Sequence, residues 1–260
     1  MDTIFATINL DHEGKKIKRR DLINDNRFYY DEIDIYVNGD KLIDSITLKK
    51  ENQIVYIYNK TLKYKCNALF YDCSLLTSIN LSRFNTKDET RMGSMFSGCS
   101  SLKSINFSNF NTENVISMEG MFSRCGSLIS LDLSSFNTSK VCTMSEMFEE
   151  CEALTSLNLS NFNTKEVRYM NRMFYNCNSL TSLNLSNFNT NKVVDMSLMI
   201  CYCPSLTYLD ISNFNCDKIK EMDKMFSLCD KLKIENVKYK DSKIGKLLSE
   251  NLKSNNCIIY

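Results

Sequence analysis

The amino-acid sequence predicts an α/β solenoid, a fold in which short coils of chain stack along one axis. Cysteine returns every 26 residues without an insertion or deletion, and phenylalanine and methionine keep the same period. A fixed period of this size is typical of solenoids, because each coil must stack in register on the next. The cysteine series is Cys73, Cys99, Cys125, Cys151, Cys177, Cys203 and Cys229. The phenylalanine series runs from Phe84 to Phe214, and the two methionine series start at Met92 and Met95.

Each coil is expected to contain one parallel strand and one short helix. Residues 180–186 alternate apolar and polar side chains, which is the period of a half-buried strand. The Asn-rich turn that follows places Phe188 in the core, and Thr190 is the predicted N-cap of a helix. The apolar residues of that helix recur at helical spacing: Val193, Met196, Met199, Ile200 and Cys203.

The chain divides into three parts. Residues 1–60 have strand-like apolar alternation and an Asn38-Gly39 hairpin signal, which predicts a β-rich N-terminal cap or a small separate domain. Residues 61–238 form the solenoid of about seven coils. Residues 239–260 form a C-terminal cap with an amphipathic helix, because apolar residues stand at 244, 247, 248 and 252.

Composition excludes several classes of protein. The 32 basic and 31 acidic residues leave a net charge of +1, so we expect no nucleic-acid partner. The one strongly basic run, residues 15–20, is interpreted as a solvated loop rather than a phosphate site. No stretch is apolar enough to span a membrane, and residues 1–15 do not resemble a secretory leader. The chain as written is therefore expected in the cytoplasm, a reducing compartment.

The twelve cysteines are predicted to be structural free thiols. Cysteines in one column of a stacked core have parallel side chains, which disfavours disulfide geometry, and a small buried thiol packs as an apolar residue. Zinc is the alternative, but zinc sites use tetrahedral clusters of Cys and His, and this chain has a single histidine, His12.

We expect no enzymatic activity and no cofactor. Catalysis needs a few unlike groups that converge at one point, whereas the periodic columns place like groups in rows. The sequence contains neither a G-x-x-x-x-G-K phosphate loop nor a G-x-G-x-x-G motif.

The predicted sheet face carries the first candidate binding surface. Its central column consists of Asn80, Asn106, Asp132, Asn158, Asn184 and Asp210, flanked by two columns that are mostly serine. Tyr208 adds an aromatic anchor. The alternative is a solvated face on which Asn and Ser side chains bond to one another between coils.

The predicted helix side varies more from coil to coil. Tyr169, Arg172 and Tyr175 stand three residues apart there and form the best exposed cluster of interface-type residues. Variation is equally typical of a solvated face without a partner.

One motif resembles a known family. It reads Leu154-Thr-Ser-Leu157-Asn-Leu159-Ser-Asn-Phe162-Asn-Thr164, followed by Val167, Met170, Met173-Phe174, Cys177, Ser179 and Leu180. This pattern is similar to the BspA-like leucine-rich repeats, including the mycoplasma-lipoprotein type, over roughly two-thirds of the chain. The resemblance implies a leucine-rich-repeat solenoid with its strands on a concave face. It also implies an adhesive or protein-recognising role, often at a cell surface, with no catalytic residues to carry over.

The sequence thus predicts a non-enzymatic, monomeric interaction module that presents a repeat surface to a protein or glycan. Two alternatives remain open: a structural protein that assembles end to end, and a thiol redox or metal-binding protein.

Overall fold

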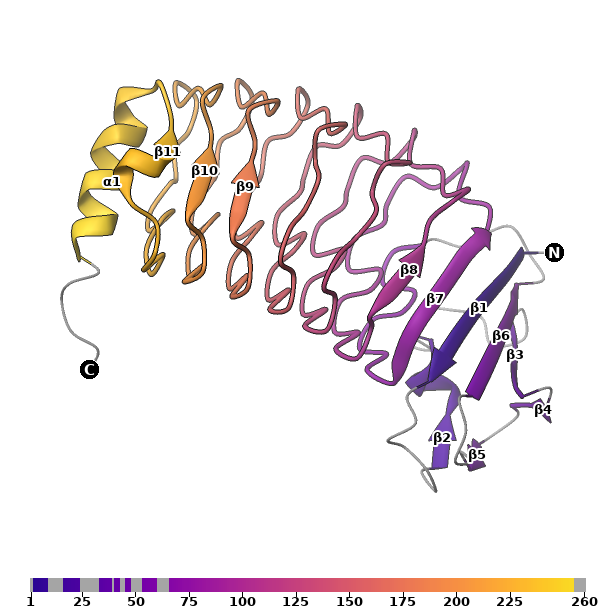
Figure 1. Cartoon of the computed structure of the whole chain (residues 1–260). Helices are drawn as coiled ribbons and strands as arrows, with labels where there is room; N and C mark the ends of the chain where they lie inside the picture. Colours follow the sequence, from indigo (N-terminus) through magenta and orange to yellow (C-terminus); the bar gives the residue numbers. More distant parts are fainter. Residues whose placement is uncertain are drawn as a thin grey trace.

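The computed structural model describes residues 2–8, 16–23, 33–38, 40–42, 45–47, 53–59 and 66–254. Within these, coils of chain lie side by side in a curved row between an N-terminal sheet and a C-terminal helix (Figure 1). Some sequence predictions concern residues outside the described ones, namely those for His12, Lys15, Gly39, 61–65 and Cys257.

The N-terminal sheet is continuous with the sheet of the coils. It has the strand order β4-β3-β6-β1-β7-β8. The strands are β1 (Asp2–Ile8), β3 (Ile33–Val37), β4 (Asp40–Lys41), β6 (Gln53–Asn59), β7 (Leu76–Arg83) and β8 (Ser104–Asn106). Strand β1 pairs antiparallel with β7, and β7 pairs parallel with β8. The first coil therefore has its sheet edge covered by β1. A separate two-stranded sheet joins β2 (Lys16–Lys18) to β5 (Ser45–Thr47), and the 3-10 turn η2 (Arg19–Asp21) follows β2.

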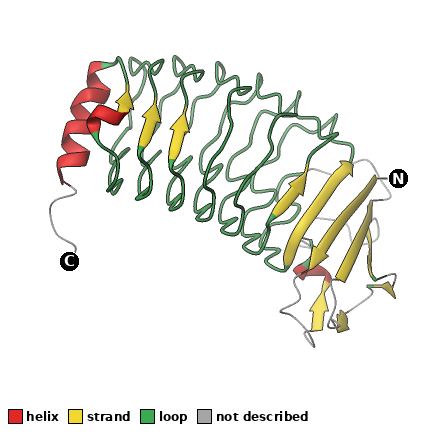
Figure 2. Ribbon diagram, viewed as in Figure 1, coloured by secondary structure: helices red, strands yellow, loops and turns green. Residues whose placement is uncertain are grey.

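The C-terminal end has a second small parallel sheet and a helix (Figure 2). The sheet order is β11-β10-β9, from β9 (Ser182–Asn184), β10 (Tyr208–Asp210) and β11 (Val237–Lys238). The 3-10 turn η5 (Ile234–Asn236) precedes β11, and α1 (Ser242–Ser254) follows it. Helix α1 lies where the sequence predicts an amphipathic helix, and it buries Ile244 and Leu248.

The short helix expected in each coil is replaced by a run of turns in residues 66–238, so this part of the prediction is wrong. In this turn segment every second peptide group lies along the stacking axis. The backbone N–H groups of Ser94 and Phe96 donate to the carbonyls of Glu119 and Met121 in the next coil, at 2.7 and 2.9 Å. The N–H groups of Met92 and Gly98 donate to the next coil in the same way, and this set of four bonds recurs in the following coils. The hydrogen bonds that would run within a helix are therefore made between coils.

Left-handed residues explain why no helix forms. Each coil has two residues with positive φ four positions apart, for example Arg172 (φ 55°) and Asn176 (φ 59°). A residue in this conformation interrupts a right-handed helix. The apolar spacing of three, three, one and three is compatible with a short helix and also with the observed run of turns. In both structures, residues at this spacing point their side chains into the core.

Threonine makes bonds between coils where the sequence predicts a helix N-cap. The Thr164 hydroxyl donates to the carbonyl of Asn189 at 3.0 Å and accepts the N–H of the same residue at 2.7 Å. Thr190 makes the same pair of bonds to Asn215. Since no helix starts here, the N-cap role is wrong, and each buried hydroxyl instead joins two neighbouring coils.

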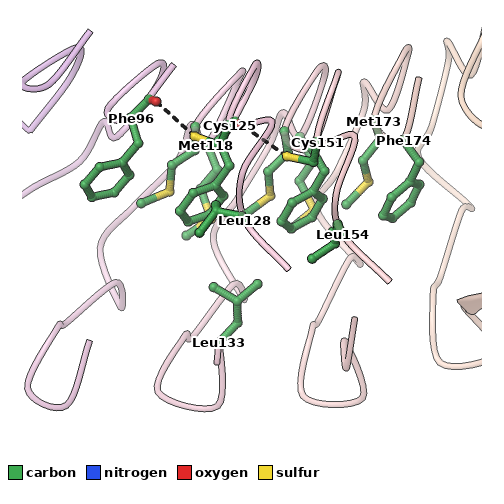
Figure 3. Packing of buried hydrophobic residues seen from close by; sticks show 14 of the residues in the cluster. Phe96, Met118, Cys125, Leu128, Leu133, Cys151, Leu154, Met173 and Phe174 are labelled. Carbon is green, nitrogen blue, oxygen red and sulfur yellow. Dashed lines mark hydrogen bonds between the residues drawn. The ribbon is translucent and has the colours of Figure 1, made fainter. Parts of the chain in front are cut away.

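The core is a series of like side chains in contact. The rings of Phe70, Phe96, Phe122, Phe148 and Phe174 stack with centroids 5.6–5.7 Å apart and interplanar angles of 5–10°. Methionine and cysteine columns lie beside them, as Figure 3 shows for Met118, Cys125 and Cys151. Offset aromatic pairs of this kind add roughly 0.5–1.5 kcal/mol each beyond their buried area.

Side chains of helix α1 and of Asp241, which directly precedes it, accept hydrogen bonds from the last coil. The N–H of Phe226 donates to Asn251 Oδ1 at 3.2 Å, and the N–H of Cys216 donates to Asp241 Oδ2 at 2.9 Å. In earlier coils the N–H equivalent to that of Phe226 donates to a backbone carbonyl 25 residues later. The last coil therefore ends on side-chain oxygens.

Candidate functional site

The central column of the sheet face has one repeated local geometry. In each coil the Asn or Asp side-chain oxygen accepts the backbone N–H of the serine two residues later, at 3.0–3.1 Å. The residues are Asn80, Asn106, Asp132, Asn158, Asn184 and Asp210. These bonds run within a coil rather than between coils, so the sequence-based picture of an Asn–Ser network joining coils is wrong for them. Each side chain is instead oriented by its own turn.

A neighbouring asparagine column joins one coil to the previous one. Asn161 Nδ2 donates to the carbonyls of Leu133 and Phe136, both at 3.0 Å. Asn187 makes the equivalent two bonds one coil later. Ser135 takes this place in one coil, and its hydroxyl donates to the carbonyl of Phe107 at 3.3 Å. Serine is the shorter side chain, so less of the face is filled there.

This face is hollowed at the coil of Asp132. The sequence predicts a strand in every coil, but residues 130–134 and 156–160 form none, so the prediction is wrong for these two coils. One hollow of about 520 Å³ is lined by Ile105, Asn106, Phe107, Ser108, Asp132, Ser134 and Ser135. A second of about 120 Å³ is lined by Leu131, Asp132, Leu133, Ser134, Asn158, Ser160 and Asn161. Both include Asp132 and Ser134. The coil reads Asp132-Leu-Ser-Ser135, where the next two coils read Asn-Leu-Ser-Asn and the third reads Asp210-Ile-Ser-Asn213. The face is therefore hollowed at the coil where Ser135 replaces the asparagine that joins neighbouring coils.

Asp132 is the charged group of this region. The backbone N–H and the hydroxyl of Ser134 lower the pKa of its carboxyl group below the ordinary value. Asp132 is exposed and is therefore ionised at neutral pH. Within residues 66–254, as far as they are described, no ion pair to Asp132 is found. The hollow thus presents an uncompensated negative charge.

Asp210 has a different environment in the same column. It is only 7% exposed, and its Oδ2 lies 3.8 Å from Lys238 Nζ and 3.3 Å from the hydroxyl of Tyr208. Burial acts to raise its pKa, but the bonds from Ser212 and the charge of Lys238 leave the pKa lowered. Lys238 also lies over the Tyr208 ring, 5.5 Å from its centroid. Tyr208 and Asp210, both predicted partner-binding residues, therefore already contact each other and Lys238 within the chain.

The second predicted cluster is only partly assembled. Arg172 lies over the ring of Tyr175, 5.1 Å from its centroid, and pairs with Glu149 Oε1 at 3.2 Å. Glu149 is 7% exposed and accepts a bond from Ser123 at 3.3 Å. Tyr169 is 46% exposed and lies in a line of isolated parallel bridges with the coils on either side. Glu149 was not singled out by the sequence analysis, although its carboxylate holds Arg172.

The thiols of the cysteine column are buried and weakly acidic. Cys151 Sγ donates to the carbonyl of Phe122 at 3.2 Å, and the same contact recurs along the column. Burial raises the pKa of Cys151 to about 12. The thiolate is the reactive form, so these groups are poor nucleophiles at neutral pH. The eleven cysteines in the described part of the chain are free, and no three His, Cys, Asp or Glu side chains converge there on a possible metal position.

These features define a protein built of repeated 26-residue units that bond side by side and carry a polar face with one hollowed region. A family model described as "Mycoplasma protein of unknown function, DUF285" matches residues 64–180 and 153–254. The chain belongs to this family. Searches of the curated proteins and of the solved structures gave no significant match. None of the helices in the described residues is long and apolar enough to cross a membrane.

Proposed function

We propose that this protein is a non-enzymatic interaction module, adhesin-like or scaffold-like, that holds a protein or glycan partner on its polar sheet face. The observation that supports this most is the pair of hollows that meet at Asp132, in the coil whose sheet-face residues depart from the pattern of the following coils. Loss of the coil-joining asparagine at position 135 is more readily explained by recognition than by packing, because the next two coils pack well with asparagine at this place.

The scaffold suits this role. We interpret the stacked coils as a leucine-rich-repeat-like solenoid, in agreement with the resemblance to BspA-like repeats. Hydrogen bonds between successive coils and the continuous phenylalanine stack would keep the face rigid. A rigid array binds with a small loss of conformational freedom, which favours affinity.

The chemistry of the hollow is polar. It offers amide, hydroxyl and carboxylate groups, while Phe107 is only 4% exposed and presents little ring surface to a partner. Such a surface selects a partner by hydrogen bonds and charge more than by apolar burial.

The proposal is tested by blocking the hollow. Ser134→Arg places a long side chain on the face at a residue that lines both hollows. Glu113→Arg introduces the same residue at an exposed turn outside both linings and serves as the control. Each variant is immobilised and presented with protein fractions and with a panel of glycans. We expect Ser134→Arg to lose partners that the native chain and Glu113→Arg retain. Equal binding by all three proteins would contradict use of this face.

A further inference from the structure

The two hollows contain one charge. Asp132 is the only ionisable residue among those that line them. Its Oδ1 accepts the N–H of Ser134 at 3.0 Å, which leaves further acceptor capacity on an ionised carboxylate. A partner that covers this charge without compensating it would leave a desolvated anion, which is strongly unfavourable. The partner must therefore bring a donor, and a cationic donor compensates best.

The protein itself contains an example of such a contact. Asp210 stands in the same column as Asp132 and is met by Lys238 Nζ at 3.8 Å, from the adjacent strand β11. The corresponding neighbour of Asp132 is Asn158, which is uncharged. Among the described residues, no cation forms an ion pair with Asp132 as Lys238 does with Asp210.

The groups beside Asp132 suit a polypeptide backbone. Asn106 and Asn158 use their side-chain oxygens to accept serine N–H groups, so their Nδ2 groups remain as donors. Asn106 and Asn158 stand in the coils before and after that of Asp132, so their amides flank the carboxylate on both sides. Amide donors match the carbonyl oxygens of an extended peptide laid across the coils.

We propose, building on the function suggested above, that the sheet face binds an extended polypeptide segment and that Asp132 receives a lysine or arginine side chain of that segment. The hollow of about 520 Å³ falls within the ~300–1,000 Å³ range of small-ligand sites, which is ample for one side chain. Asp132 supplies the charge, and Asn106 and Asn158 hold the adjacent backbone. The bound partner is thus a basic peptide segment of a protein.

The test uses a random peptide display library and the full chain. The variant Asp132→Asn removes the charge and keeps the local turn, since other coils have asparagine at this place and make the same bond. Asp195→Asn is the matched control, because Asp195 also accepts the N–H of the residue two positions later, at 2.8 Å, but lies outside both hollows. Ser134→Arg reports whether a selected peptide binds at the hollows at all.

We expect the native chain and Asp195→Asn to enrich peptides with lysine or arginine at one position. Asp132→Asn should bind those peptides about tenfold more weakly, because one charge-assisted hydrogen bond is lost. Their affinity for the native chain should also fall as salt is raised.

Two results would overturn the inference in distinguishable ways. Peptides or oligosaccharides that carry no positive charge, are blocked by Ser134→Arg and bind Asp132→Asn unchanged would refute the basic partner and leave the interaction role standing. A library and glycan panel that yield no ligand sensitive to Ser134→Arg would refute both proposals.

Discussion

Replacement of Thr164 by valine should destabilise the stack of coils strongly for so small a change. Thr164 is 1% exposed, and its hydroxyl makes two hydrogen bonds to the backbone of Asn189 in the next coil, at 3.0 and 2.7 Å. Valine has nearly the same shape but no hydroxyl, so the substitution leaves the N–H and the carbonyl of Asn189 without their partner at a partly buried place. Each lost bond of this kind costs about 1–1.5 kcal/mol, so we expect unfolding to be easier by about 2–3 kcal/mol.

The measurement is urea unfolding followed by circular dichroism, with Thr155→Val as the control. The Thr155 hydroxyl donates to the carbonyl of Ile129 at 3.4 Å, but Thr155 is exposed and water can replace that bond. We expect the control to lose less than about 0.5 kcal/mol, as exposed substitutions usually do. Equal losses in the two variants would refute the argument that buried threonines bond the coils to one another.

Three further predictions concern the turns, the thiols and the ends. Lys224→Gly should stabilise the protein by about 0.5–1 kcal/mol in thermal or urea unfolding, because Lys224 is exposed with φ 53° and glycine adopts this conformation without strain. Lys220→Gly, at a position without positive φ, should destabilise by a similar amount, and the opposite order would contradict the role of the left-handed residues. The contribution of Cys151 to stability should be constant up to about pH 8 and fall as pH rises from about 9 toward 12. Burial raises the pKa of the folded thiol to about 12, so the unfolded chain loses this proton first. Unfolding midpoints at pH 8, 9 and 10 that do not decline would contradict this, as would rapid labelling of Cys151 in the native protein at pH 8. Sedimentation over a concentration series should show a monomer, because β1 covers the sheet edge of the first coil and α1 bonds to the last, and growth of larger species with concentration would favour end-to-end assembly.

The periodic residues carry most of what the sequence can predict about this fold. The cysteine and methionine columns identify buried positions, because the same positions are buried in successive coils. The apolar spacing in residues 244–252 predicts α1, because it follows the period of an amphipathic helix. The turns were mistaken for helices because the left-handed residues give no signal of their own. Only Gly98 and Gly120 among the repeated left-handed positions of the coils are glycines, while others are residues such as Leu198 and Arg172.

The candidate site was predictable in place but not in detail. Alternation of apolar and polar residues identifies the face with Asn106, Asp132 and Asn158, since only one side of a strand can face the core. Sequence alone treated Asp132 as one member of a uniform column. The sequence shows serine at position 135 where the next coils have asparagine. That this leaves a hollow can be understood only from the bonds that Asn161 and Asn187 make to the previous coil. Those bonds are tertiary contacts, so the hollow emerges only from the folded arrangement.

The bonds of the turn segment have a consequence for how such chains can vary in length. Since the alternate N–H groups of this segment, such as those of Ser94 and Phe96, donate to backbone carbonyls of the next coil, an interior coil can follow another with little regard to its outer side chains. Asn251 receives the N–H of Phe226, which continues this series of donors in the last coil. Gain or loss of whole 26-residue units by recombination would then lengthen or shorten the recognition surface while both termini keep their original chemistry.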